Sequence, residues 1–231
     1  MNTPETISTT PHDNFQTTSK RRIKTRDMVT VSFLLAIIAV LSVTPLGFVR
    51  LPLLPELTII HVPVIIGSIL LGPVYGAFLG FAFGLSSLLN ATFAPGVLSF
   101  AFSPFYSVGE LSGNGWSIFI AFVPRILVGI TPWLVYKGLR KVLKFKGTET
   151  FSLAVAGVAG SLTNTVFVLG FIGLFFTGEL ASLMGAPASM LFKIIMSVVA
   201  TNGVPEAILA GIVTVAVCKA AFVIGRRPGN V

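Results

Sequence analysis

One arginine lies deep within an apolar run of the sequence. Arg125 follows Pro124 and stands about nine residues after Trp116, where this run begins. A guanidinium buried in a membrane costs several kcal/mol unless an anion or several acceptors satisfy it. Its partner is either structural, namely Glu206 or a carbonyl freed by Pro124, or a substrate carboxylate held in a bidentate fork. We favour the substrate carboxylate and keep the structural pairing open.

Further polar residues interrupt two other apolar runs. Asn164 lies at about mid-depth of its run beside Thr163, and Asn202 and Glu206 stand where the last run begins. An amide offers donors and an acceptor, which suits a ligand with amide and hydroxyl groups, although interhelical hydrogen bonding explains Asn164 nearly as well. Asn202 is alternatively the N-cap of the last helix, with Pro205 in its first turn.

These polar residues predict a pocket. In the topology derived below, Arg125, Asn164, Asn202 and Glu206 come from three helices and lie near the middle or in the outer half of the bilayer. Their convergence predicts an outward-facing, polar binding site, to which Thr163 is also assigned.

A histidine and a group of aromatic residues are predicted on the same outer side. His61 is near the outer end of the second apolar run and is either a pocket residue or a satisfied structural histidine. Phe102, Phe105 and Tyr106 belong to a long, unusually apolar connection between Thr92 and Gly115. They form either an interfacial aromatic belt or a hydrophobic lid over the pocket.

The composition requires a membrane. Of 231 residues, 54% are hydrophobic and 10% are charged, so most of the surface cannot face water. The single cysteine, Cys218, excludes a disulfide framework or a cysteine metal site, and no metal site is predicted. The net charge of +8 comes from basic clusters at the ends of apolar runs, which indicates membrane topology and not nucleic-acid binding.

The chain is therefore predicted to be an all-α membrane protein with six transmembrane helices. The predicted spans are Met28–Leu46, Thr58–Leu71, Val74–Ala91, Trp116–Tyr136, Phe151–Phe176 and Val204–Phe222. Residues 189–200 are placed as a separate short helix, with the first half of a long, kinked final helix as the alternative. Residues 1–26 are predicted to be a disordered basic tail, 27–223 the membrane domain and 224–231 a basic C-terminal tail.

The basic clusters predict the orientation. With six spans, the clusters in residues 20–26, 137–146 and 219–227 all fall on one side, which the positive-inside rule assigns to the cytoplasm. Both termini are then cytoplasmic.

Small residues recur at helical spacing on two predicted helices. On the third helix they are Gly72, Gly76, Gly80 and Gly84, a face that lets a neighbouring helix approach closely. On the first helix they are Ser32, Ala36 and Ala39, which serve either internal packing or a partner protein.

Motifs for common chemistry are missing from the sequence. It has no Walker-type glycine loop, no His-Glu-x-x-His and no Gly-x-Ser-x-Gly, and it offers few nucleophiles or metal ligands. We therefore expect a non-catalytic protein, with any energy supplied by another subunit.

Several segments together resemble a known family. Residues 58–67, 71–76, 102–105, 124–129, 160–165 and 202–206 resemble the substrate-binding S-components of energy-coupling-factor (ECF) vitamin transporters, most closely the pantothenate-specific branch. The resemblance implies a six-helix S-component fold in the bacterial plasma membrane. It also implies vitamin capture from outside and docking onto a T-component with two cytoplasmic ATPases, which bind the ATP, so no cofactor is expected in this chain.

The resemblance also implies residue roles. Arg125 would neutralise the pantothenate carboxylate, while Asn164 and Asn202 would bind its amide or hydroxyl groups. The family's first helix carries an Ala-x-x-x-Ala docking face, matched here only by Ser32 and Ala36, with Ala39 nearby. The alternatives are an S-component for another small carboxylated compound such as biotin or a lipoate-like acid, a stand-alone secondary carrier, and an intramembrane enzyme using His61 and Glu206.

Overall fold

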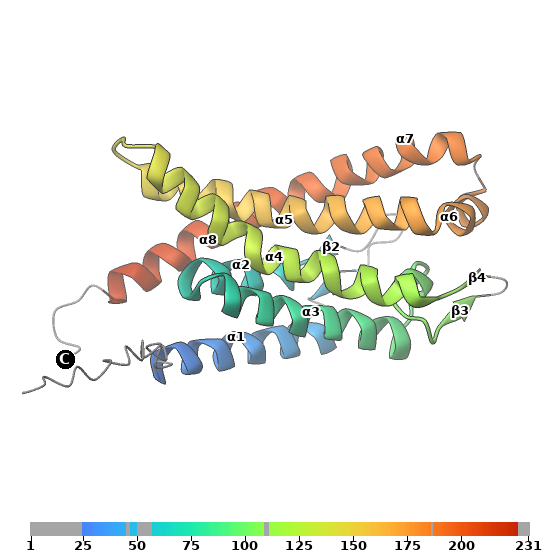
Figure 1. Cartoon of the computed structure of the whole chain (residues 1–231), viewed down its shortest axis with the longest axis horizontal. Coiled ribbons are helices and arrows are strands. Elements are labelled where there is room, and N and C mark those ends of the chain that lie inside the picture. Colours follow the sequence, from blue (N-terminus) through green and yellow to red (C-terminus); the bar gives the residue numbers. More distant parts are fainter. Residues whose placement is uncertain (1–24, 45–46, 50–56, 109–110, 186, 226–231) are drawn as a thin grey trace, which may run out of the picture.

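The described part of the chain folds into a bundle of α-helices with two short β-hairpins at its loops (Figure 1). The computed structural model describes residues 25–44, 47–49, 57–108, 111–185 and 187–225. The helices are α1 (Thr25–Val43), α2 (His61–Leu71), α3 (Pro73–Phe93), α4 (Gly115–Val142), α5 (Thr148–Phe175), α6 (Thr177–Met184), α7 (Ala188–Val198) and α8 (Val204–Gly225). A 3₁₀ turn, η1 (Ser99–Ala101), and a π-helical turn, η2 (Val199–Gly203), complete the helical elements.

The hairpins are antiparallel pairs. β1 (Phe48–Val49) pairs with β2 (Leu57–Thr58), and β3 (Ser107–Val108) pairs with β4 (Leu111–Ser112). The second hairpin joins η1 to α4, and its Gly113 fits closely against the preceding loop, since a Cβ there would lie 1.9 Å from the Ser103 carbonyl oxygen.

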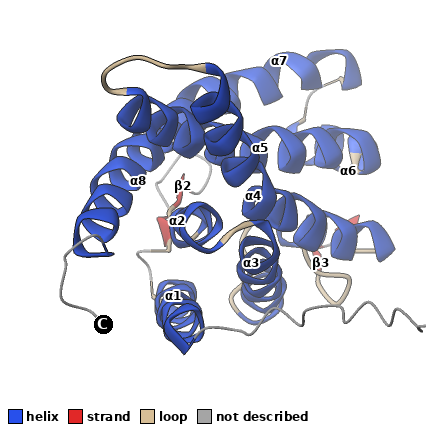
Figure 2. Cartoon of the chain, turned by 60° about the vertical axis from the view of Figure 1, so that its left-hand side comes forward, coloured by secondary structure: helices blue, strands red, loops and turns tan. Residues whose placement is uncertain are grey.

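Five helical segments of the described chain are long and apolar enough to cross a membrane: α1, α3, α4, α5 and the continuous stretch Ser189–Ile224. The remaining predicted span, Thr58–Leu71, corresponds to α2, which has only 11 residues. Nine of those residues are buried, and α2 is in contact with α1, α3, α4, α5 and α8, which surround it in the middle of the bundle (Figure 2). A helix enclosed on all sides needs no polar face, which explains why the sequence of α2 is apolar apart from His61 and Ser68.

The glycine face of α3 packs directly on α4, as predicted. An added Cβ would lie 1.9 Å from the Gly129 carbonyl oxygen at Gly76 and 2.2 Å from the Arg125 carbonyl oxygen at Gly80. Gly72 differs, because it joins α2 to α3 with a φ of 99° and precedes Pro73 at the first turn of α3. The backbone that carries Arg125 is thus held against α3 without intervening side chains.

The last helix is longer than the predicted span Val204–Phe222. The prediction of a separate short helix over residues 189–200 is wrong, because α7, η2 and α8 form one helical stretch with a π-helical turn in the middle. The alternative of one long final helix is correct. Asn202 lies inside η2 and is therefore not an N-cap. A π-helical turn lets a helix continue with one wider turn, and such turns are frequent at functional sites.

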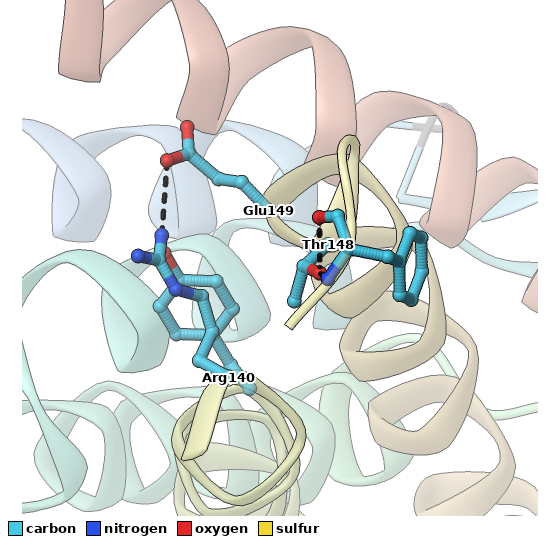
Figure 3. A network of polar contacts seen from close by, with 5 residues as sticks. Arg140, Thr148 and Glu149 are labelled. Atoms are coloured by element: carbon cyan, nitrogen blue, oxygen red, sulfur yellow. Dashed lines mark hydrogen bonds and ion pairs between the residues drawn. The ribbon is translucent and has the colours of Figure 1, made fainter. Parts of the chain in front are cut away.

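Most basic residues of the described chain gather at one end of the bundle, with Arg125 and Lys193 as the exceptions. The start of α1, the α4–α5 junction and the end of α8 share this end, at the left of Figure 1. Here Arg140 forms an ion pair of 2.9 Å with Glu149, and the Thr148 hydroxyl donates to the Phe145 carbonyl at the start of α5 (Figure 3). The predicted tails lie outside the described residues except at their inner ends, where 25–26 and 224–225 already belong to α1 and α8.

Candidate ligand-binding site

A cavity of about 390 Å³ lies between the helices, toward the end of the bundle at which α3 ends. The end of α3, the η1 loop, α4, α5, η2 and α8 line it together with Thr58 of β2. Its polar lining consists of Thr58, Ser87, Asn90, Ser99, Arg125, Asn164, Thr165, Asn202 and Glu206. This mixture of apolar walls and a few convergent polar groups is typical of a small-molecule site.

Arg125 is the one lysine or arginine among the residues that line the cavity. Its side chain is 5% exposed, and Nη1 donates a hydrogen bond of 2.7 Å to the Ile120 carbonyl oxygen. That carbonyl is the one freed by Pro124, so this part of the structural alternative is present. Nε is buried and has no hydrogen-bond partner in the described part of the chain. No ion pair joins Arg125 to Glu206 or to any other described carboxylate.

Two aromatic rings enclose the guanidinium. Its Cζ lies 4.8 Å from the centre of the Phe102 ring and 5.4 Å from that of Phe83. Cation–π contacts of this kind stabilise a guanidinium but supply no acceptor for its N–H groups. Arg125 therefore keeps a hydrogen-bonding demand that a ligand carboxylate would satisfy.

Glu206 faces the cavity from α8 and also contacts the first hairpin. Its side chain is 9% exposed, and Oε1 accepts a hydrogen bond from the backbone N–H of Thr58. The contact joins residues far apart in the sequence and connects β2 to the last helix. Glu206 thus has a structural role beside any contact with a ligand.

The two asparagines approach the cavity from neighbouring helices. Asn164 of α5 is 7% exposed and Asn202 of η2 is 5% exposed, and α5 packs along η2 and α8. The Asn164 Oδ1 atom is buried without a hydrogen-bond partner among the described residues. A free acceptor on a residue that lines the same cavity as Arg125 suits a ligand that has both a carboxylate and hydrogen-bond donors.

Two predicted site residues lie outside the cavity lining. His61 is 1% exposed and belongs to the first turn of α2, inside the bundle. Thr163 is not among the lining residues, and its hydroxyl donates a hydrogen bond of 2.7 Å to the Ala159 carbonyl of α5. A direct pocket role for either residue has no support in this geometry.

Only one of the three predicted lid residues lines the cavity. Phe102 lines the cavity, whereas Phe105 is 78% exposed and neither Phe105 nor Tyr106 belongs to the lining. The segment is held by the Ser117 hydroxyl, which donates 2.7 Å to the Phe100 carbonyl, and by a 2.7 Å hydrogen bond between Thr92 and Ser103. This loop is thus a wall of the cavity, and Phe102 is the one predicted lid residue that lines it.

Sequence reasoning missed several polar lining residues. Ser87 and Asn90 are one turn apart on α3, and the Asn90 side chain also donates 3.3 Å to the Ser42 carbonyl of α1. Their spacing of three was a usable signal, because it places both on one side of the helix. Thr58 carried no such signal, because it belongs to the short strand β2 and not to a helix with a regular spacing.

The small residues of α1 face outward. Ser32, Ala36 and Ala39 are exposed, while α1 packs into the bundle through Val31, Leu34 and Ile38. The alternative that the small face serves internal packing is thus wrong.

The Glu206–Thr58 contact gives a direct prediction. We expect Glu206→Ala to speed hydrogen–deuterium exchange of the Thr58 amide by about tenfold, because the amide loses its acceptor. Glu206→Gln keeps an oxygen in the same place and is the matched control, with exchange close to the wild type. Equal exchange in all three proteins, measured by mass spectrometry of peptides that cover residues 57–59, would contradict the contact.

Comparison with known proteins agrees with this arrangement. Residues 26–218 match the family model described as ECF transporter, substrate-specific component. The chain is 39% identical over 206 residues to the pantothenic acid transporter PanT of Lactococcus lactis subsp. cremoris, covering 87% of this chain and 95% of that protein. It is 35% identical over 200 residues to the pantothenate transporter PanT of Leuconostoc mesenteroides subsp. mesenteroides, covering 84% and 90%. The match extends over all the helices that form the cavity, and the chain belongs to the family of substrate-specific components of ECF transporters, which are non-catalytic subunits that pass the membrane several times.

Proposed function

We propose that this protein captures pantothenate in the cavity between α3, α4, α5 and α8. The observation that carries the proposal is the Arg125 guanidinium, which belongs to a residue of the cavity lining, has no hydrogen-bond partner at Nε and has no described carboxylate to neutralise it. Pantothenate has a carboxylate for this cation, and its amide and two hydroxyls match Asn164, Asn202 and Glu206. Both named relatives are pantothenate transporters, which supports this ligand over other small acids.

The proposed topology places the cavity on the outer side of the membrane. It counts α2 as the sixth membrane helix and puts both termini in the cytoplasm, since the basic end of the bundle is then inside. The partners would be a T-component and two cytoplasmic ATPases, with the exposed face of Ser32, Ala36 and Ala39 as the docking surface. A stand-alone carrier would instead take up the vitamin without these subunits.

The competing functions differ in how much support they have. An intramembrane enzyme using His61 and Glu206 is contradicted by the non-catalytic family, and His61 does not belong to the cavity lining. An S-component for biotin or a lipoate-like acid would also use a cation, but both of those ligands have longer apolar parts and fewer hydroxyls. The polar residues that line the cavity together with Arg125 favour the more hydrophilic acid.

The test is the identity of the bound molecule. We expect mass spectrometry of the detergent-purified protein to find pantothenate, chemically unaltered, and radiolabelled pantothenate to bind with one site per chain. Unlabelled biotin and lipoate serve as controls and should not compete at a hundredfold excess. Competition by biotin or lipoate, or an altered ligand, would contradict the assignment. Uptake that needs co-expressed ATPase subunits separates the proposed subunit from a stand-alone carrier.

A further inference from the structure

We propose that Pro124 is a positioning residue for the ligand-binding cation, because it frees the Ile120 carbonyl to hold one side of the Arg125 guanidinium. The inference rests on the proposed function where ligand binding is concerned, but the positioning itself can be measured without a ligand. It starts from the difference between the two prolines inside α4.

The first step is the backbone of α4. In an α-helix the N–H of residue 124 would donate to the carbonyl of residue 120, and proline has no N–H. Pro124 therefore leaves the Ile120 carbonyl without its helical donor at a site where Ile120 is fully buried. A buried carbonyl without a donor costs free energy, so another group has to satisfy it.

The second step is the direction of the arginine. Helical side chains lean toward the N-terminus of their helix, so Arg125 extends back over the preceding turn, where Ile120 lies. Its Nη1 meets the Ile120 carbonyl oxygen at 2.7 Å. The buried carbonyl and the buried guanidinium thus satisfy each other in part.

The third step concerns the rest of the guanidinium. With Nη1 directed at the backbone, Nε and Nη2 form the remaining edge of the fork, and neither has a hydrogen bond to the described residues. Two parallel N–H groups on one edge are the geometry that binds a carboxylate bidentately. The rings of Phe83 and Phe102 restrict the plane of the group. The freed carbonyl therefore fixes which edge of the guanidinium is left without a hydrogen-bond partner, and we infer that this is the edge a ligand carboxylate takes.

The second proline of α4 provides the contrast. Pro132 likewise removes the donor to the carbonyl four residues before it, that of Val128. No side chain in the described part of the chain donates to that carbonyl. Pro132 is buried on the same helix, so Pro132→Ala repeats the backbone change without an arginine nearby.

The binding test uses the full-length protein in detergent. Pro124→Ala restores the backbone N–H of residue 124, which then donates to the Ile120 carbonyl in place of Arg125. We therefore expect pantothenate to bind about tenfold more weakly. The affinity for the analogue with an alcohol in place of the carboxylate should change less than twofold. In an Arg125→Ala background, Pro124→Ala should have no further effect on pantothenate affinity. Pro132→Ala should leave the ratio of the two affinities unchanged. Equal losses for both ligands, or the same loss in the Arg125→Ala background, would overturn the positioning role.

A second measurement needs no ligand. Phenylglyoxal reacts with both terminal nitrogens of a guanidinium, and one of them is held by the Ile120 carbonyl. We expect Arg125 to be modified several times faster in Pro124→Ala than in the wild type or in Pro132→Ala, as measured by peptide mass spectrometry. An unchanged rate in Pro124→Ala overturns the inference. If the wild type binds no pantothenate, the proposed function fails, and this rate alone decides the role of Pro124.

Discussion

Arg125→Ala is expected to weaken pantothenate binding by roughly a hundredfold or more. The substitution removes a buried, charge-assisted, bidentate contact and leaves the ligand carboxylate in a poorly hydrated cavity, at a cost of about 3 kcal/mol. The measurement is equilibrium binding of radiolabelled pantothenate to the detergent-purified protein. The loss should be confined to ligands with a carboxylate, because only they face the guanidinium.

Two variants make this prediction specific. Arg125→Lys keeps the charge but loses the planar fork, so its affinity should fall between those of the wild type and Arg125→Ala. Arg140→Ala removes an exposed arginine at the opposite end of the bundle, where it pairs with Glu149, and should bind like the wild type. Wild-type affinity in Arg125→Ala would remove the main support for a carboxylated ligand in this cavity.

The sequence could predict those site residues whose burial in a membrane costs free energy. Arg125, Asn164 and Glu206 interrupt apolar runs, and a charge or an amide inside a membrane is stable only with partners. Their type and depth therefore indicated a common pocket before any coordinates, and the cavity has all three in its lining. The glycine spacing of α3 was equally informative, because a close helix contact has a fixed period.

Other features had no sequence signal of this kind. Phe102 and Phe105 are three residues apart in the same apolar loop, yet one stacks on the arginine and the other is exposed. Aromatic residues suit a pocket wall and a membrane interface equally well, so composition does not separate the two. Thr58 reaches the cavity only because β2 contacts Glu206 on a helix 148 residues later in the chain.

The helix boundary that we predict before α8 is wrong for a related reason. Asn202, Gly203 and Pro205 together are typical of a helix start, and local rules placed a boundary there. The structure continues the helix through the wider turn of η2 instead. This turn brings Asn202 to the cavity beside Glu206, so the residues that locally predict an interruption are those that line the site.

Gly80→Ala is expected to be strongly damaging for a change that adds a single methyl group. The added Cβ would lie 2.2 Å from the Arg125 carbonyl oxygen, which is backbone and cannot rotate away. The two helices would have to separate, which we expect to cost about 2 kcal/mol or more and to lower the melting temperature in detergent by several degrees. Because α4 carries Arg125, the affinity for pantothenate should fall together with the melting temperature.

Gly138→Ala is the matched control on the same helix pair. Gly138 belongs to α4, and a Cβ there would meet no atom within 4 Å. Alanine also has the higher helix propensity, by about 1 kcal/mol in a helix interior, so this variant should melt at or slightly above the wild-type temperature and bind pantothenate normally. Equal melting temperatures for Gly80→Ala and Gly138→Ala would show that α3 and α4 are not in backbone contact. Since that contact fixes the height and direction of Arg125 at the cavity, its loss would also remove the physical basis for a preorganised cation.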